Sequence, residues 1–144
     1  MSMEPTVSTT GGCLCGAVRY EIAGPLRAVV YCHCEQCRKT SGHFVAATAC
    51  KPDDLEIKGD TGLRWYRSSP AAQRGFCSSC GSSLFWRPEH GEYVAIMAGA
   101  IDAPTGLASR EHIHTASASD YYSLTDGLPQ FPEEHAGLWE AGGT

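Results

Sequence analysis

The sequence predicts a mainly β protein of short antiparallel strands that binds zinc through cysteine thiolates. Two observations lead to this prediction. Short apolar or alternating runs recur between turns of glycine, proline and serine, and most of the cysteines gather in local groups. The predicted strands cover residues 17–22, 28–31, 44–50, 63–67, 74–76, 83–87 and 93–98. One helical turn is predicted over 35–41, and a second irregular or helical piece over 117–124.

Length and composition indicate one globular domain. The chain has 144 residues, of which 42% are hydrophobic and 19% charged, which argues against disorder and against a coiled coil. We predict a single domain over 1–144, with residues 1–10 and 133–144 frayed. The net charge is −5 and the longest basic run is Arg38-Lys39, so the clustered cations that nucleic-acid binding requires are missing.

The beginning of the chain is polar up to Gly12 and has no signal-peptide pattern. No stretch approaches the roughly 20 apolar residues of a membrane helix. We therefore expect a cytoplasmic protein with no membrane partner. Thiols stay reduced in the cytoplasm, so the eight cysteines are interpreted as metal ligands rather than as disulfides. The sequence does not indicate an oligomeric state.

Two of the three cysteine groups predict a closed structural zinc site. Cys77 and Cys80 form a zinc knuckle, because two intervening residues let both thiols reach one ion and the glycine that follows permits a tight turn. A knuckle supplies two ligands and a structural zinc needs four. Cys13 and Cys15, also followed by a glycine, are the natural complement. Such a site would tie the N-terminal strand to a hairpin far along the chain.

The middle group predicts an open zinc site. Cys32, Cys34 and Cys37 provide three ligands within six residues and no obvious fourth. Three protein ligands with one open position are typical of catalytic zinc. Three thiolates make the metal a poor activator of water but suit it to holding another thiol as its thiolate. We therefore expect a sulfur-containing substrate to bind at this open position.

For several residues near the cysteine groups, the sequence leaves two interpretations open. Cys50 either packs in the core or closes the middle site as a fourth ligand. His33 lies between two ligands, and at that spacing we expect it to point away from the metal. His112 and His114 alternate along a predicted strand and would share one face, either as solvated residues or as part of a site. For each tryptophan, a place in the core and a place in the pocket both stay open; the three are Trp65, Trp86 and Trp139.

Two arginines beside the cysteine groups can either be solvated or bind substrate. Arg38 directly follows the middle group and Arg74 precedes the knuckle. Cations beside a thiolate site lower thiol pKa values and attract a carboxylate. Arg38 and Arg74 are therefore the candidate contacts for a substrate carboxylate, whereas Lys39 is expected to be solvated.

With these residues assigned, the sequence resembles the glutathione-dependent formaldehyde-activating enzyme family, also called the CENP-V/GFA domain family. The matching segments follow the family's order along nearly the whole chain. They are GGCLCGAVRYEI at 11–22, CHCEQCRKTSG at 32–42, RGFCSSCGSSLFW at 74–86, AGAID at 98–102, and HIHT with DGLPQF at 112–131.

The resemblance implies an Mss4-like fold of β-sheets around a structural zinc held by Cys13, Cys15, Cys77 and Cys80. It also implies a second, labile zinc on Cys32, Cys34 and Cys37. Two Zn²⁺ per chain are therefore expected. The implied activity is that of a carbon–sulfur lyase, which joins glutathione and formaldehyde as S-hydroxymethylglutathione. Two positions depart from the family pattern and can alter the pocket: Tyr121-Tyr122 replaces a frequent tryptophan, and His43 replaces a small residue.

Three functions follow as hypotheses. The first is an enzyme that holds a thiol at the middle cysteines and adds it to an aldehyde. The second is a non-catalytic zinc module that binds a protein partner, which a closed four-ligand middle site would favour. The third is a methionine sulfoxide reductase, which needs a nucleophilic cysteine outside the metal sites; only Cys50 is left for that role.

Overall fold

The residues that the structure describes form two β-sheets joined at a common core. The computed structural model describes residues 8–134 and 137–139. One sheet is three-stranded, in the order β1-β2-β5, and the other is seven-stranded, in the order β10-β3-β4-β9-β8-β7-β6. The strands are β1 (Ser8–Gly12), β2 (Val18–Ala23), β3 (Val29–Cys32), β4 (Val45–Cys50), β5 (Leu55–Asp60), β6 (Leu63–Ser69), β7 (Ala72–Cys77), β8 (Ser83–Pro88), β9 (Val94–Met97) and β10 (Ser109–Ile113).

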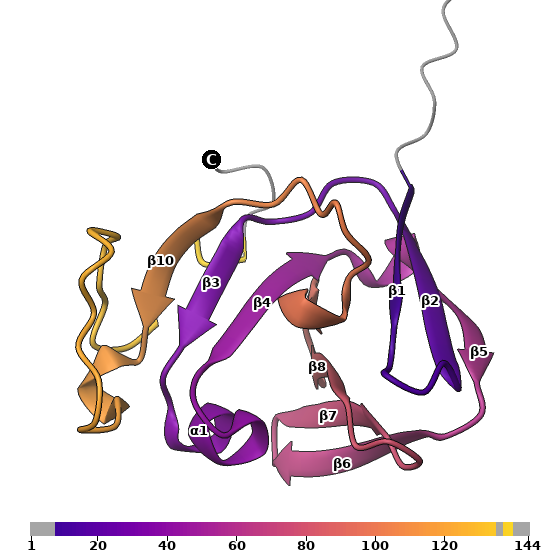
Figure 1. Ribbon diagram of the computed structural model, residues 1–144, viewed down its shortest axis with the longest axis horizontal. Helices are drawn as coiled ribbons and strands as arrows, with labels where there is room; N and C mark the ends of the chain where they lie inside the picture. The colour runs from indigo at the N-terminus through magenta and orange to yellow at the C-terminus, as the bar shows by residue number, and fades with distance from the viewer. Residues whose placement is uncertain (1–7, 135–136, 140–144) are drawn as a thin grey trace, which may run out of the picture.

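The mainly antiparallel β fold predicted from the sequence is confirmed. Every strand pair is antiparallel except β10 and β3, which run parallel at the edge of the larger sheet. The seven predicted strands correspond to β2, β3, β4 and β6 to β9. Figure 1 shows β10, β3 and β4 side by side, with the small sheet on the other side of the molecule.

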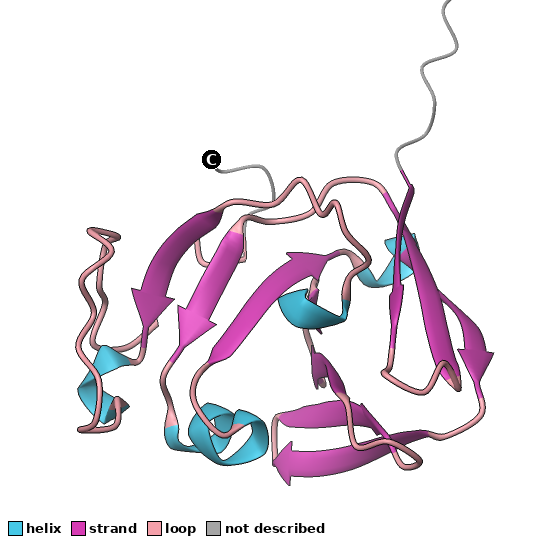
Figure 2. Cartoon of the chain, in the orientation of Figure 1, coloured by secondary structure: helices cyan, strands magenta, loops and turns pink. Residues whose placement is uncertain are grey.

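Helical structure is confined to short pieces (Figure 2). α1 (Glu35–Ser41) coincides with the predicted helical turn. The 3₁₀ turns are η1 (Pro52–Asp54), η2 (Ala98–Ala100) and η3 (Thr115–Ser117), and irregular chain follows η3 as predicted for 117–124. α1 is the longest helix among the described residues, so no helix there could cross a lipid bilayer.

The expected fraying is wrong for parts of both ends. Ser8 to Thr10 pair with β2 in register as part of β1. Near the other end, Leu138 is buried and Trp139 stacks on Trp86, with ring centroids 5.5 Å apart. Of the segments predicted to fray, residues 1–7, 135–136 and 140–144 lie outside the described residues.

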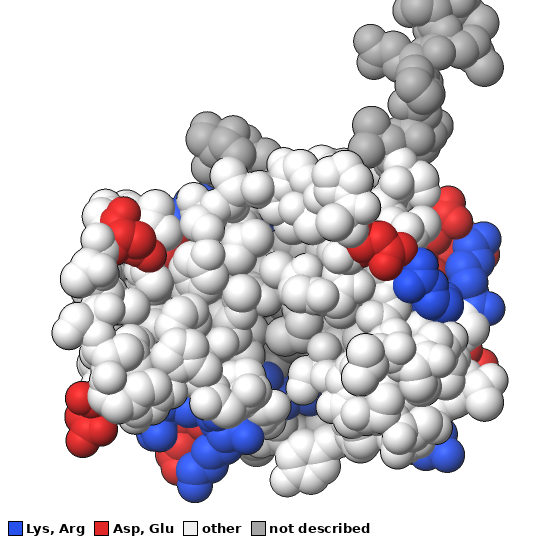
Figure 3. Space-filling model, viewed as in Figure 1, with Lys and Arg blue, Asp and Glu red and all other residues white. Residues whose placement is uncertain are grey.

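The main core lies where the two sheets meet. Tyr20 and Ile22 from β2 pack there with Phe85 and Ile96 from the larger sheet. The rings of Tyr20 and Phe85 meet edge to face at 5.3 Å between centroids. Burial of this apolar surface is the dominant force holding the sheets together. The face in Figure 3 is largely uncharged, with acidic and basic side chains gathered along its edges.

Candidate metal centres and active site

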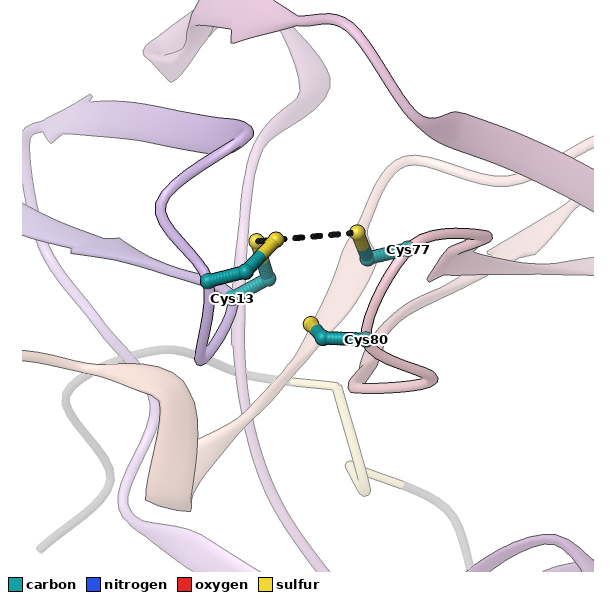
Figure 4. Close-up of side chains that lie close together, drawn as sticks. Cys13, Cys77 and Cys80 are labelled. Atoms are coloured by element: carbon teal, nitrogen blue, oxygen red, sulfur yellow. Dashed lines mark hydrogen bonds between the residues drawn. The ribbon is translucent and has the colours of Figure 1, made fainter.

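Four cysteine sulfurs meet between two hairpin turns. Cys13 and Cys15 lie in the turn between β1 and β2, whereas Cys77 ends β7 and Cys80 lies in the turn to β8. All four sulfurs lie within 4.8 Å of one another. Figure 4 shows Cys13 facing Cys77 and Cys80 across the gap between the turns. The cluster therefore joins the small sheet to the large one.

The backbone of each turn shapes this cluster. Gly16 and Gly81 follow the second cysteine of each pair and adopt φ values of 85° and 80°. These are left-handed conformations that glycine adopts without strain. In one turn the Val18 amide donates to Cys13 Sγ at 3.2 Å, and the Leu14 amide donates to Ser82 Oγ of the other turn at 3.0 Å. The sequence interpretation that the glycine after Cys80 permits a tight turn agrees with the φ of Gly81, and Gly16 has the same role after Cys15.

The sulfur positions fit a tetrahedral zinc. Zn–S bonds of about 2.3 Å place tetrahedral sulfurs about 3.8 Å apart. The Cys13–Cys15 and Cys15–Cys77 sulfurs are 3.6 and 3.8 Å apart. The Ser82 hydroxyl and amide lower the pKa of the Cys80 thiol to about 5, which favours the thiolate that a metal requires.

The middle group forms a second, three-sulfur cluster at the corner between β3 and α1. Cys32 ends β3, Cys34 caps α1 and Cys37 lies in the first turn of the helix. Their sulfurs also lie within 4.8 Å of one another. Cys37 is buried and its amide donates to Cys34 Sγ at 3.4 Å. The thiols of Cys32 and Cys37 lower the pKa of Cys34 to about 2, whereas Cys34 raises that of Cys32.

A pocket of about 240 Å³ opens onto these three sulfurs. Its walls are mostly apolar and come from β3, β4, β8, β9 and the C-terminal segment. The polar side chains around it are few: Arg27, Gln36, Ser69, Arg74, His114 and Glu134. Among the described residues no fourth cysteine, histidine or carboxylate completes the three-sulfur group. The open position expected from the sequence therefore faces a cavity.

Tryptophans from two distant segments form one wall of this pocket. Trp86 and Trp139 stack with their ring planes 9° apart. Arg27 lies over the Trp139 ring, 5.0 Å from its centroid, and donates to the Leu138 carbonyl at 3.2 Å. Arg110 donates to the same carbonyl at 2.9 Å. Trp65 packs against Phe85 in the core instead, so the three tryptophans separate into core and pocket.

The two candidate arginines lie in different places. Arg74 lines the pocket, and its Nη2 is 3.8 Å from Cys37 Sγ. Arg38 is not among the lining residues. Of these two arginines, Arg74 is the one that lines the pocket at the three sulfurs.

Two histidines, His33 and His112, belong to a hydrogen-bonded chain on the far side of the three-cysteine segment. As expected, His33 points away from the sulfurs: its Nδ1 lies 2.5 Å from the Tyr122 hydroxyl and its Nε2 2.8 Å from His112 Nδ1. His112 Nε2 in turn lies 2.8 Å from Asp126 Oδ2. No local sequence pattern could have joined these residues, because His33 and its partner Tyr122 are 89 positions apart.

The expectation that His112 and His114 share a strand face is wrong. His112 is buried within β10, whereas His114 follows the end of the strand with φ 55°. This left-handed residue breaks the alternation. His114 consequently lines the pocket, while His112 joins the histidine chain.

Cys50 belongs to the core. It is fully buried on β4 among residues such as Val18 and Val94. Burial raises the pKa of its thiol to about 12, so it is neither a fourth ligand nor a reactive nucleophile. This finding confirms core packing for Cys50 and removes the cysteine on which the methionine sulfoxide reductase hypothesis depends.

Fold and sites together define a mostly β protein with two thiol clusters suited to zinc, one closed and one open to a pocket. The model of one protein family, described as glutathione-dependent formaldehyde-activating enzyme, matches residues 8–117. The chain belongs to this family, as its motifs indicated.

Individual relatives agree with this assignment. A protein of Halomonas elongata, named a putative glutathione-dependent formaldehyde-activating enzyme, is 27% identical over 91% of this chain and 93% of its own length. An uncharacterized lyase of Schizosaccharomyces pombe is 31% identical over 57% of this chain and 59% of its own. A crystal structure of a Rhodobacter sphaeroides protein shares the fold, with a TM-score of 0.56 and 24% identity over 67% of this chain and 91% of that chain.

Proposed function

We propose that the protein is a zinc-dependent carbon–sulfur lyase that acts on thiol adducts of aldehydes at the Cys32, Cys34 and Cys37 cluster. The observation that carries the proposal is the pocket that opens onto a three-sulfur group. Relatives named as a formaldehyde-activating enzyme and as a lyase support a reaction of this kind, with glutathione and formaldehyde as the reference substrates. The cytoplasmic location stays a prediction.

The donor sets determine which metal fits. Sulfur-only ligands favour zinc over hard cations, and we propose two ions per chain, one on each cluster. At the closed cluster the ion would be structural. At the open cluster it would supply a Lewis acid that stabilises a bound thiolate.

The protein side chains orient the reactants. The apolar walls formed by Val45, Met97 and Trp86 would limit the access of water to the sulfurs, and Arg74, with its Nη2 3.8 Å from Cys37 Sγ, would pair with a carboxylate of the thiol. Holding thiol and aldehyde side by side converts a bimolecular addition into a step within one complex. The thiol sulfur bonds to the carbonyl carbon, and the thiol proton ends on the carbonyl oxygen, giving a hemithioacetal. The lyase direction reverses these changes.

NMR exchange spectroscopy tests the proposal. The zinc-loaded protein should interconvert formaldehyde and S-hydroxymethylglutathione faster than the spontaneous background. Cys34→Ser should abolish the acceleration and lower the zinc content from two to one per chain. Cys50→Ala is the matched control, because it removes a cysteine outside both clusters. The folded, zinc-loaded wild type could instead exchange this and other thiol adducts only at the spontaneous rate. That result would contradict the enzyme and favour a non-catalytic zinc module.

A further inference from the structure

The pocket at the three sulfurs is small. Its volume of about 240 Å³ lies below the range of about 300–1,000 Å³ that is usual for drug-sized ligands. Trp86 and Trp139 line both this pocket and a neighbouring hollow that reaches Pro88 and Tyr93. On another side the pocket shares Val45, Arg74 and Met97 with a second hollow. The stacked tryptophans therefore lie between two small spaces.

The walls of the pocket favour an apolar ligand. Val30, Val45, Ala47 and Met97 face it beside the tryptophan pair. Tryptophan rings prefer stacked or edge-on contacts with other flat groups, which add to the gain from burying apolar area. A second carboxylate against these walls would lose its hydration without a partner.

One cation of the pocket is available to a ligand. Arg74 Nε is buried and has no hydrogen-bond partner among the described residues, and its Nη2 makes only long contacts, 3.4 Å to Gln36 Oε1 and 3.8 Å to Cys37 Sγ. This buried guanidinium nitrogen is a donor that the acceptor of a ligand would satisfy. A carboxylate is the group that matches it best.

The other charged residues do not provide a second carboxylate site. Arg27 donates to the backbone carbonyls of Ala28, Ala47 and Leu138 and lies over the Trp139 ring. Glu134 stands at the pocket near His114, at 3.7 Å, and would repel a further anion. Glutathione, by contrast, carries two carboxylates and an ammonium group along a tripeptide.

We infer that the preferred thiol of this protein is smaller and less charged than glutathione: a monocarboxylate with an aromatic or branched apolar body. Its carboxylate pairs with Arg74 and its body packs against Trp86 and Trp139. This inference rests on the proposed function, which places the ligand sulfur at the three cysteines. Glutathione then binds with much of its length outside the pocket.

Isothermal titration of the zinc-loaded protein with three thiols tests the inference. The probes are 2-mercapto-3-phenylpropionate, its uncharged analogue 2-phenylethanethiol, and glutathione. The aromatic monocarboxylate should bind roughly tenfold or more tightly than either of the others, which is the factor expected from one charge-assisted hydrogen bond. A cobalt-substituted sample reports whether each sulfur reaches the metal, through its thiolate charge-transfer absorption.

Variants separate the two contacts. Arg74→Gln should weaken binding of the monocarboxylate about tenfold and leave binding of 2-phenylethanethiol unchanged. The control is Arg64→Gln, which replaces an exposed arginine on the adjacent strand and should change neither affinity. Trp139→Ala should join the two hollows and reduce the preference over glutathione. Circular dichroism checks that each variant is folded.

The outcomes distinguish this inference from the proposed function. Glutathione binding as tightly as the aromatic monocarboxylate, with both reaching the cobalt, would overturn the inference and leave the lyase proposal standing. A cobalt spectrum that no thiol perturbs would overturn both. An affinity order that Trp139→Ala leaves unchanged would also contradict the inference, because the wall would then not select the ligand.

Discussion

The two cysteine clusters have similar ligands but opposite surroundings. The four-sulfur cluster joins two glycine-containing turns from different sheets, and its sulfurs complete a tetrahedral set. The three-sulfur cluster lies within six residues at the corner between β3 and α1, and it faces a pocket. One cluster joins segments that are distant in sequence, whereas the other is local.

This difference in connectivity predicts a difference in role. A metal that joins residues 13 and 80 restricts the unfolded chain strongly and substitutes for core that a small domain lacks. A metal held by residues 32 to 37 constrains a short loop that the strand and helix already order. Stability should therefore depend on the closed cluster and chemistry on the open one.

Cysteine substitutions test this division most strongly. Cys77→Ser should leave no cooperative thermal transition, because structural zinc contributes about 10–16 kcal/mol in zinc-finger peptides, comparable to or above the roughly 5–15 kcal/mol stability of a whole domain. Cys37→Ser should keep the β-sheet spectrum and one zinc per chain. Circular dichroism and metal analysis measure both. Loss of folding in Cys37→Ser, or a stable Cys77→Ser protein, would contradict the division.

Much of the closed cluster could be predicted from the sequence because its determinants are local. The pairs Cys13/Cys15 and Cys77/Cys80 each carry the glycine that their turn requires. Helix α1 was likewise predictable, since it begins within the cysteine group and ends at Gly42, which adopts φ 88°. The strands β1 and β5 were missed. For β5 the alternation of Leu55 and Ile57 was a usable signal.

The rest depends on tertiary contacts that no local pattern encodes. β1 contains Gly11, an unfavourable strand residue, yet a Cβ there would lie 2.4 Å from the Tyr20 hydroxyl oxygen and 2.6 Å from the Ala100 carbonyl oxygen. Trp139 lies in a glycine-rich tail whose sequence predicts fraying. Its place in the pocket is held by Arg27, more than a hundred positions away. Sequence therefore predicted the sulfurs better than the pocket that they face.

The hydrogen-bonded histidines behind the three-sulfur cluster allow a further test of the difference between the two clusters, with a smaller expected effect. Tyr122→Phe removes the hydroxyl beside His33 Nδ1 and leaves a buried ring nitrogen without its partner. We expect a loss of about 1–3 kcal/mol in urea unfolding and faster zinc transfer from the open cluster to a chelator, because His33 lies between Cys32 and Cys34. Tyr121→Phe is the matched control: its hydroxyl is 2.5 Å from His43 Nδ1 but the ring is 61% exposed. Equal effects of the two variants would show that the chain does not orient the cluster.

The smallest expected effect concerns an ion pair on the closed-cluster side. Asp102 accepts hydrogen bonds from Arg19 Nη2 at 2.6 Å and from the Thr10 hydroxyl at 2.7 Å, and so ties the β1–β2 hairpin that carries Cys13 and Cys15 to the chain after η2. Arg19, and then Thr10, lower the pKa of this carboxyl from 3.8.

Because the pKa of Asp102 is lower in the folded state, its carboxylate stabilises the fold above pH 3.8, and this contribution disappears as the pH falls through the lowered value. Asp102→Asn should therefore reduce stability slightly at pH 7 and flatten the acid limb of the unfolding curve below about pH 4. Urea unfolding of wild type, Asp102→Asn and the exposed-site control Asp120→Asn between pH 3 and 7 measures this difference. A large effect of Asp102→Asn at pH 7 would mean that the ion pair, and not the four-sulfur cluster alone, holds the N-terminal hairpin in place.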